Sequence, residues 1–568
     1  MPTLPPQLKD FKSLQTPEIF PMEFQVIDVE RTLTPILERT VRMGRVNKSK
    51  TSKEANAYET YLNLLMSSDK IVGLEQQSAR RLAVLNGWLR SSVVVFNRKG
   101  DNKKREGMDY IRPLTLGIFR SGLPVTQTQS RKIDQWVYRT AIGQIDESQA
   151  KQRALKMLFT NTLGVGIDFG LNIGDNPKYN GLESMDLNAI LAMYFLQGFP
   201  EPDRSPASKD TDTDIATSVR DINEILFEPE AFRMIGKDVV ELLQLYGDTL
   251  SAIEITDHLA ALISIRLFQA PLRVARALRA CVEQAKTELV DGGNTTNPVE
   301  IYSDFTNGKV AESELLAKNC VQRDLNYHQI LYNDRFFVRA LQMAEPLLMD
   351  RRVDFASMKM ASRIRYLVNT RHEDDFQMAL RLNIQTFKSG IENLADVPKD
   401  EWKAVLEDLE QVQNLKPEEV LSGLMHHAVA PRALAQQFMW FYSTGGMRTS
   451  NLHRGYAILS GSQGAKSTWK YAMTDSVLTS IILLCFVEGN GTRTGKTLRL
   501  ETLLQRMRDR FGILVAEPPT SMRSYENYQA ASSNKKAFIS KLQLLGCYEG
   551  LSDDFSSQLV RRPREASK

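Results

Sequence analysis

Apolar residues recur every three or four positions along most of the chain, which is the spacing of helices that bury one face. Many of these segments begin with Ser, Asp or a Pro-Glu pair and end near Gly or Pro, as helices do. Two lie near the N-terminus, at residues 53–68 and 73–90. From residue 130 onward the pattern dominates and predicts helices at residues 146–163, 184–197, 228–247, 271–289 and 310–348. The chain is therefore predicted to be mainly α-helical.

The helical spacing is interrupted near the N-terminus. Residues 91–97 and 110–119 are rich in β-branched residues, which favour strands, and the segment between them is polar and basic. This pattern predicts two strands around a long basic loop at 98–107. Residues 1–22 contain five prolines and few periodic apolar positions, so we expect an extended arm there.

The C-terminal segment has a regular order of predicted elements. A helix capped by Asp475 precedes a glycine-rich loop, and a second helical pattern spans residues 498–513 with its apolar residues on one side. A third helix runs from Ser524 to Leu545 and ends at Gly546. Residues 547–562 then alternate like two strands around a polar turn. Three helices followed by a hairpin is the order of a winged helix. Its predicted core comprises Leu500, Leu504, Phe511, Phe538, Leu542, Leu545 and Phe555.

Two polar stretches with turn residues, at 200–214 and 291–298, mark candidate linkers. The sequence shows no repeat of 20–50 residues, so a regular solenoid is not expected. We therefore predict a multi-domain protein with four parts. These are a small mixed α/β region with a basic loop at 1–125, helical domains at 126–290 and 291–474, and a winged-helix-like domain at 475–568.

Composition narrows the class of protein. Hydrophobic residues make up 42% of the chain and charged residues 25%, which excludes global disorder. Four cysteines are too few for a disulfide framework in a chain of this length, and no two are close enough for a CxxC motif. The first residues lack the apolar core of a signal peptide, and the apolar run 477–487 is shorter than the ~20 residues that span a bilayer. We expect a reduced, cytoplasmic protein without a membrane partner.

Charge is distributed unevenly along the chain. Residues 1–150 carry 23 basic and 16 acidic residues, and residues 491–568 carry 14 and 8. The segment between them carries 35 basic and 44 acidic residues, although the whole chain has a net charge of only +4. Two basic ends around an acidic middle suit a polyanion or an acidic partner, while ordinary surface variation stays an alternative.

Two groups of basic residues are candidates for nucleic-acid binding, and Tyr525 and Tyr528 are interleaved with the second group. Such charge supplies affinity for phosphate without base specificity. Two alternatives stay open, because winged helices also dock proteins and lysine-rich helices are often only solvated. The candidates are Lys103, Lys104 and Arg105 in the predicted loop, and Arg523, Lys535, Lys536, Arg561 and Arg562 near the C-terminus.

The glycine-rich segment 489–497 invites comparison with a phosphate-binding P-loop. Gly495, Lys496 and Thr497 fit that motif, but its required first glycine is Asn490. The apolar run before the segment is predicted to be a helix, whereas a P-loop follows a strand. We therefore expect a solvated turn here and assign no cofactor.

The six residues RDLNYH contain the sharpest catalytic candidates, Arg323 and His328. They resemble the Arg-polar-x-x-x-His pattern of HEPN-type ribonucleases, in which Arg would hold the phosphate and His would act as acid or base. The signal has low specificity, because a similar loose spacing occurs at Arg365/His372 and Arg448/His453. A solvent-facing Arg and a helix-packing His form the structural alternative.

Metal ligands are not grouped in the sequence. His426 and His427 are adjacent, so on a helix they point about 100° apart and do not readily share one ion. The chain has no HExxH motif and no cluster of Cys and His. We predict no metal site.

The C-terminal segment also carries a family resemblance. Two of its segments resemble the ends of uncharacterised proteins from bacterial multi-gene anti-phage defence islands. They are RLETLLQRMRDRFGI and KKAFISKLQLLGCYEGLSDDFSSQLVRRP. The systems concerned are methylation-associated or phosphorothioation-type, and the resemblance covers mainly the last ~90 residues. It transfers no catalytic motif. It implies a subunit that works beside nucleases, ATPases and a methyltransferase.

Together these observations favour a binding role over catalysis. We predict an accessory subunit of a prokaryotic anti-phage defence complex that binds nucleic acid, with DNA as a candidate ligand, or other subunits of the system. The alternatives are a HEPN-like ribonuclease that uses Arg323 and His328, and a purely structural scaffold.

Overall fold

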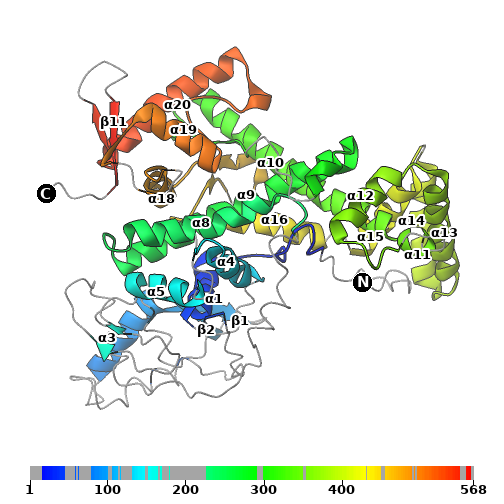
Figure 1. Ribbon diagram of the computed structural model, residues 1–568, viewed down its shortest axis with the longest axis horizontal. Helices are drawn as coiled ribbons and strands as arrows, with labels where there is room; N and C mark the ends of the chain where they lie inside the picture. The colour runs from blue at the N-terminus through cyan, green and yellow to red at the C-terminus, as the bar shows by residue number, and fades with distance from the viewer. Residues whose placement is uncertain are drawn as a thin grey trace.

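The protein is described from a computed structural model of residues 1–568 (Figure 1). The structure describes residues 16–41, 43–44, 58, 62, 79–99, 105–112, 116, 131–146, 151–163, 167–168, 178–179, 225–290, 299–348, 354–412, 414–429, 432–448, 455–462, 464–488, 491–492, 495–550 and 558–563. The predicted helices at 53–68 and 184–197 and both predicted linkers lie wholly or almost wholly outside these residues.

The described chain is mainly helical, as the apolar spacing predicts. The α-helices of its first half are α1 Val29–Val41, α3 Ala79–Trp88, α4 Ile133–Ile142, α5 Lys151–Leu163, α8 Pro229–Tyr246 and α9 Ala252–Gln284. Those of its second half are α10 Ala311–Gln342, α11 Glu345–Leu348, α12 Met360–Thr370, α13 Asp374–Glu392, α14 Asp396–Gln411, α15 Pro417–Val429, α16 Arg432–Thr444, α18 Asp475–Cys485, α19 Leu500–Phe511 and α20 Tyr525–Leu544. None of the helices in the described part of the chain is long and apolar enough to cross a membrane.

Helices α8 and α9 lie in the middle of the fold, with α1, α4 and α5 on one side and α18, α19 and α20 on the other (Figure 1). Helix α9 begins with a capping box, in which Ser251 accepts a hydrogen bond from the Glu254 backbone and Glu254 accepts one from the Ser251 backbone. The predicted start at Pro271 is wrong, because the helix begins at Ala252 and continues through this proline. Pro271 has no N–H for the Leu267 carbonyl one turn earlier, and Trp440 of α16 donates to that carbonyl at 3.0 Å instead.

The prediction of an extended N-terminal arm is wrong for the residues of it that the structure describes. Residues 16–20 form a turn, in which the Phe20 backbone donates to the Thr16 carbonyl at 2.9 Å. Phe20 is buried, and its ring packs edge-on against Trp440 of α16 with centroids 5.6 Å apart. This segment is therefore part of the packed core, and the rest of the predicted arm, residues 1–15, lies outside the described residues.

The strands are short. They are β1 Val94–Lys99, β2 Arg105–Ile111, β3 Ile167–Asp168, β4 Lys178–Tyr179, β5 Ile301–Tyr302, β6 Leu459–Ser460, β7 Lys470–Tyr471, β8 Thr497–Arg499, β9 Ile513–Leu514, β10 Tyr548–Gly550 and β11 Gln558–Arg561. Strands β1 and β2 pair antiparallel, with Val94 opposite Ile111. The first predicted N-terminal strand overlaps β1. The second begins at Arg105, earlier than the predicted residue 110, so the loop is shorter.

The C-terminal elements follow the predicted order with one addition. Strand β8 pairs with β11, so the predicted hairpin β10–β11 becomes a three-stranded antiparallel sheet in the order β10-β11-β8. Asp475 is the first residue of α18 rather than its cap. Gly546 follows α20 with a positive φ of 67°, as expected of a terminating glycine. Of the predicted core, Leu500, Phe511, Phe538 and Leu542 are buried, Leu504 and Leu545 are partly buried, and Phe555 lies outside the described residues.

Backbone pairing joins these C-terminal elements to the rest of the molecule. Strand β9 pairs in parallel with β5, which places Ile513 opposite Ile301. The turn before β9 needs Gly512, whose φ is +63° and whose position leaves only 1.7 Å between an added Cβ and the Val299 carbonyl oxygen. Contacts therefore cross the predicted boundary at residue 475, although the domain limits themselves stay predictions.

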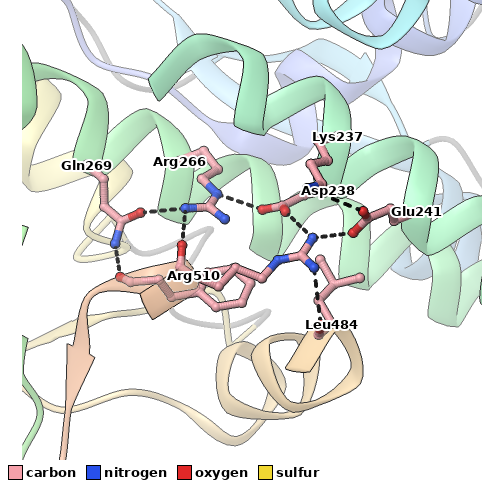
Figure 2. A network of polar contacts seen from close by, with 8 residues as sticks. Lys237, Asp238, Glu241, Arg266, Gln269, Leu484 and Arg510 are labelled. Atoms are coloured by element: carbon pink, nitrogen blue, oxygen red, sulfur yellow. Dashed lines mark hydrogen bonds and ion pairs between the residues drawn. The ribbon is translucent and has the colours of Figure 1, made fainter. Parts of the chain in front are cut away.

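A buried cluster of charged side chains fixes α19 against α8 and α9 (Figure 2). Asp238 of α8 accepts a hydrogen bond of 2.6 Å from Arg266 of α9 through one oxygen. Its other oxygen accepts one of 2.6 Å from Arg510 of α19. Arg510 also binds Glu241 at 2.5 Å, and the Arg266 guanidinium carbon lies 4.5 Å from the centre of the Phe511 ring. Three helices thus meet at one carboxylate.

The arginines of the cluster also satisfy backbone carbonyls at helix ends. Arg510 donates to the Leu484 carbonyl at the end of α18, at 3.2 Å. Arg266 donates to the Arg510 carbonyl at 3.0 Å. Burial alone would raise the pKa of Asp238, but Arg266 and Arg510 outweigh that effect and hold the pKa below its usual value. The carboxylate is therefore charged and shared by two arginines.

Replacing Gly512 tests the close contact before β9. Gly512→Ala should destabilise the protein through its positive φ and through overlap with the Val299 carbonyl. Gly546→Ala is the matched control, because Gly546 has a similar φ and nothing within 4 Å of an added Cβ. We expect Gly512→Ala to lower the free energy of unfolding by about 1–3 kcal/mol more than Gly546→Ala, measured by chemical denaturation. Equal effects would show that the contact with Val299 is not tight.

Replacing Arg510 tests the charged cluster. Arg510→Met leaves Asp238 and Glu241 with fewer cations in a buried site, so the free energy of unfolding should fall by about 3–5 kcal/mol. Arg508 lies on the same helix and binds Glu517 at 2.7 Å, but both of these side chains are about one-third exposed. Arg508→Met should therefore change the free energy of unfolding by about 0–1 kcal/mol. Losses of similar size in the two variants, measured by the same denaturation, would contradict the role assigned to the cluster.

Candidate nucleic-acid interface

The inner face of α20 is held firmly against the body of the molecule. Asn534 is fully buried, and its side chain donates to the carbonyls of Ser303 at 2.8 Å and Val515 at 3.1 Å. The same side chain accepts from the Phe305 backbone at 2.7 Å. The ring of Phe538 packs on that of Phe305 with their centroids 4.9 Å apart. A polar clamp and an aromatic contact thus determine which face of the helix is turned outward.

The opposite side of α20 lies along the margin of the molecule (Figure 1). Most of its exposed residues fall within about 120° of one another around the helix axis, at 100° per residue, so they form a single face. Ser524 caps the helix by accepting a hydrogen bond from the Asn527 backbone. Glu526 and Leu544 are also exposed but lie to one side of this face. We call the set the outer face of α20, and it comprises Tyr525, Tyr528, Gln529, Ser532, Lys536, Ser540 and Gln543.

The C-terminal basic candidates have different environments. Arg523 is exposed just before α20, and Lys536 is exposed on its outer face. Lys535 is half-buried, whereas the sequence predicts a solvated position. Arg561 is exposed at the end of β11. These four residues therefore lie at or near the molecular surface.

Arg562 differs from the expectation of a surface contact. Its side chain is only 9% exposed, and its guanidinium carbon lies 5.9 Å from the centre of the Tyr246 ring on α8. Its backbone donates to the Lys496 carbonyl at 3.1 Å, beside the pairing of β11 with β8. The residue packs the sheet against α8, so we correct its assignment from nucleic-acid contact to packing residue.

The N-terminal basic candidates are placed only in part. The backbone of Arg105 begins β2. Its side chain, together with Lys103 and Lys104, lies outside the described part of the chain. The hypothesis that these three residues bind nucleic acid stays a prediction.

Arg323 belongs to α10 and is engaged in structural contacts. It donates to Asp324 at 2.9 Å and also to the Glu300 carbonyl. Asp324 in turn accepts from the Tyr471 hydroxyl at 2.7 Å. Burial would lower the pKa of Arg323, but the charge of Asp324 outweighs it and raises the pKa above its usual value. The guanidinium therefore helps to join α10 to β7 and to the segment before β5.

His328 lies on the same helix and is buried, with 1% of its surface exposed. Its ring packs edge-on against Phe441 with centroids 5.0 Å apart, and neither ring nitrogen has a hydrogen-bond partner among the described residues. Burial lowers its pKa to about 3. A general acid or base must reach a substrate and exchange protons near neutral pH. This geometry favours the helix-packing alternative over the ribonuclease hypothesis.

The glycine-rich segment connects a helix to a strand. Helix α18 precedes it, and Thr497 begins β8, where it pairs with Arg561. A P-loop has the opposite order, a strand followed by a helix whose first turn carries the Lys and Thr. The order of elements therefore favours a turn. Within the described ranges, no group of three or more His, Cys, Asp or Glu residues is arranged to hold a metal ion.

The residues that position α20 are not recognisable from the sequence. Asn534 lies within a helical pattern and looks like any polar helix residue, although it is fully buried. Asp238 and Arg510 are 272 residues apart, so no local spacing relates them. The sequence holds only a weak signal for this clamp. Asn534 is four positions before Phe538, so it lies on the side of the helix that the apolar residues share.

These features define a mainly helical protein in which the outer face of α20 is exposed and polar and carries Lys536. The chain belongs to the family of the methylation-associated defense system protein MAD7, whose model matches residues 9–564. The match extends over nearly the whole chain, so the resemblance is not confined to the C-terminal segment, and it identifies the methylation-associated type of system. Comparison with curated proteins found no match, and comparison with solved structures found none either.

The pH dependence of stability tests the burial of His328. In the unfolded chain its pKa should be about 6.5, so acid protonates the unfolded state while the buried ring stays neutral down to about pH 3. Stability should therefore fall as the pH drops below 6.5. His328→Leu removes this contribution, so between about pH 7 and 4.5 its free energy of unfolding should fall by about 2–3 kcal/mol less than that of the wild type. Denaturation at each pH measures both proteins, and a difference between them that does not change with pH would contradict the neutral, buried state.

Proposed function

We propose that the chain is an accessory subunit of a methylation-associated defence system and that it binds nucleic acid through the outer face of α20. In this proposal residues 475–563 form a winged-helix-like unit, with α20 as its third helix. Three helices and the sheet order β10-β11-β8 support that assignment. Family membership supports a place beside other subunits of such a system. We place that system in the cytoplasm.

The observation that carries the proposal is the character of the outer face of α20. Gln529, Ser532 and Ser540 can donate and accept hydrogen bonds there, and Lys536 adds positive charge. Arg523 adds a second exposed cation at the N-terminal end of the face. A helix face with this composition suits the negative, hydrogen-bonding surface of a nucleic acid.

Binding rather than catalysis is favoured by the positions of Arg323 and His328. The guanidinium is engaged by Asp324, and the imidazole is buried without a hydrogen-bond partner among the described residues. We therefore do not propose the ribonuclease. The scaffold hypothesis makes a different prediction, because a pure scaffold would not bind nucleic acid through α20.

Charge reversal on α20 tests the proposal. The double variant Arg523→Glu/Lys536→Glu should bind DNA more weakly for all sequences alike, because phosphate contacts carry no sequence information. The slope of log Kd against log salt concentration should also flatten by up to about one unit per lost contact. Fluorescence anisotropy with a labelled DNA at several salt concentrations measures both quantities.

Arg381→Glu/Lys359→Glu is the matched control, because it reverses the same number of charges at exposed residues on α13 and just before α12, away from α20 (Figure 1). It should leave affinity and salt slope close to those of the wild type. Wild-type affinity and slope in the α20 double variant would sink the proposal. If the full chain binds neither DNA nor RNA, the scaffold hypothesis takes its place.

A further inference from the structure

Two tyrosines at the start of α20 are unusually exposed. Tyr525 is 76% exposed and Tyr528 is 45% exposed, whereas most large aromatic side chains of the described chain are buried. Aromatic rings left in water forgo the stabilisation that burial gives, so an adjacent pair indicates a ligand-binding surface more than a packing surface. Residues three apart on a helix have their Cβ atoms about 5–6 Å apart. The two residues are therefore neighbours on the outer face of α20.

Neighbouring side chains leave this pair accessible. Gln529 donates to the Tyr525 hydroxyl at 3.3 Å, a contact at the rim of the ring that leaves its π-face uncovered by a hydrogen bond. Glu526 is the only acidic residue of the helix, and it accepts from the Ser524 hydroxyl at 3.4 Å. It lies about 100° around the axis from Tyr525, so its charge is beside the outer face and not on it.

Cations lie on both sides of the tyrosine pair. Arg523 precedes Tyr525 by two residues and is exposed. Lys536 follows Tyr525 at a distance of about 16 Å along the helix axis and only about 20° around it. Aromatic rings combined with basic residues along one track are the usual components of a surface for single-stranded nucleic acid. Charge complementarity therefore points to a polyanion that carries flat, exposed rings of its own.

We propose that Tyr525 and Tyr528 form a stacking platform for unpaired bases of DNA, while Arg523 and Lys536 contact the phosphates of the same strand. This inference rests on the proposed function and names its ligand class, a single strand rather than a duplex. Inside a duplex, neighbouring base pairs cover one another's faces and leave only the two end pairs open, so a tyrosine ring stacks far more readily on the bases of a single strand. A platform of this kind accepts any base, because every base has a π-face.

The experiment compares ring removal with ring retention in the full-length chain. The double variant Tyr525→Ala/Tyr528→Ala loses both rings, and Tyr525→Phe/Tyr528→Phe keeps them but removes the hydroxyl groups. The probes are a labelled oligothymidylate and a blunt duplex of the same length, measured by anisotropy. The alanine variant should bind the single strand at least about tenfold more weakly, with an unchanged salt slope. Its affinity for the duplex should stay within about twofold of the wild-type value, and the phenylalanine variant should resemble the wild type.

Several results would overturn the platform, and they can be told apart from failure of the proposed function. Single-strand affinity that survives in the alanine variant, while Arg523→Glu/Lys536→Glu still weakens binding, removes the platform and leaves the proposed function standing. Equal weakening on duplex and single strand shows that the rings do not select unpaired bases. Loss of binding to another subunit of the system, with nucleic-acid binding intact, makes the pair a protein contact. If Arg523→Glu/Lys536→Glu binds DNA as the wild type does, the proposed function itself is contradicted.

Discussion

The buried carboxylate of Asp238 determines how the middle and the C-terminal part of this chain are held together. Its side chain is 1% exposed, and an ion in such a place is stable only with opposite charges beside it. Arg266 supplies one cation from α9, and Arg510, which is 272 residues after Asp238 in the chain, supplies the other from α19. The arginines then bind helix-end carbonyls that need a donor (Figure 2). The relative placement of α8, α9, α18 and α19 is thus tied to one ionised group.

The orientation of α20 follows from this anchor through a short chain of contacts. Gly512 follows α19, and the next residues pair with β5. Asn534 then binds backbone groups on both of these segments, at Ser303 and at Val515. The outer face of α20 is therefore part of a fixed body and not a module on a tether. A nucleic acid bound there would have one defined orientation relative to the central helices.

Much of the helical architecture could be predicted from the sequence, because each helix buries one face and leaves a periodic trace. The segments predicted at 228–247 and 310–348 match α8, α10 and α11 closely. The start of α9 was predicted wrongly at Pro271, because a proline inside a buried helix looks like a helix start in the sequence. Strand β8 was missed, since three residues are too few to show alternation and its partner β11 is remote in sequence.

The residues of the candidate site could be predicted only where the exposure of a side chain follows from the spacing of nearby apolar residues. Lys536 falls on the polar side of α20 that the spacing of Phe538 and Leu542 already implies, whereas Arg523 lies just before that helix. Arg562 has the same local composition but lies against Tyr246, a neighbour that only the tertiary fold supplies. His328 shows the same effect. Its spacing from Arg323 looks like a motif, but the residue is buried on α10. Long-range packing decides such cases, and it leaves no trace in the spacing of residues.

Site-specific photo-crosslinking tests the central claim, that the outer face of α20 touches nucleic acid, most directly. A photoreactive phenylalanine at Ser532 lies in the middle of that face, and the same group at Gln385 lies on the exposed side of α13. With labelled DNA bound to the full-length chain, we expect a crosslink to the DNA from position 532 and none from position 385. DNA that binds the chain without crosslinking at position 532, or a crosslink there only to another protein, would contradict the account.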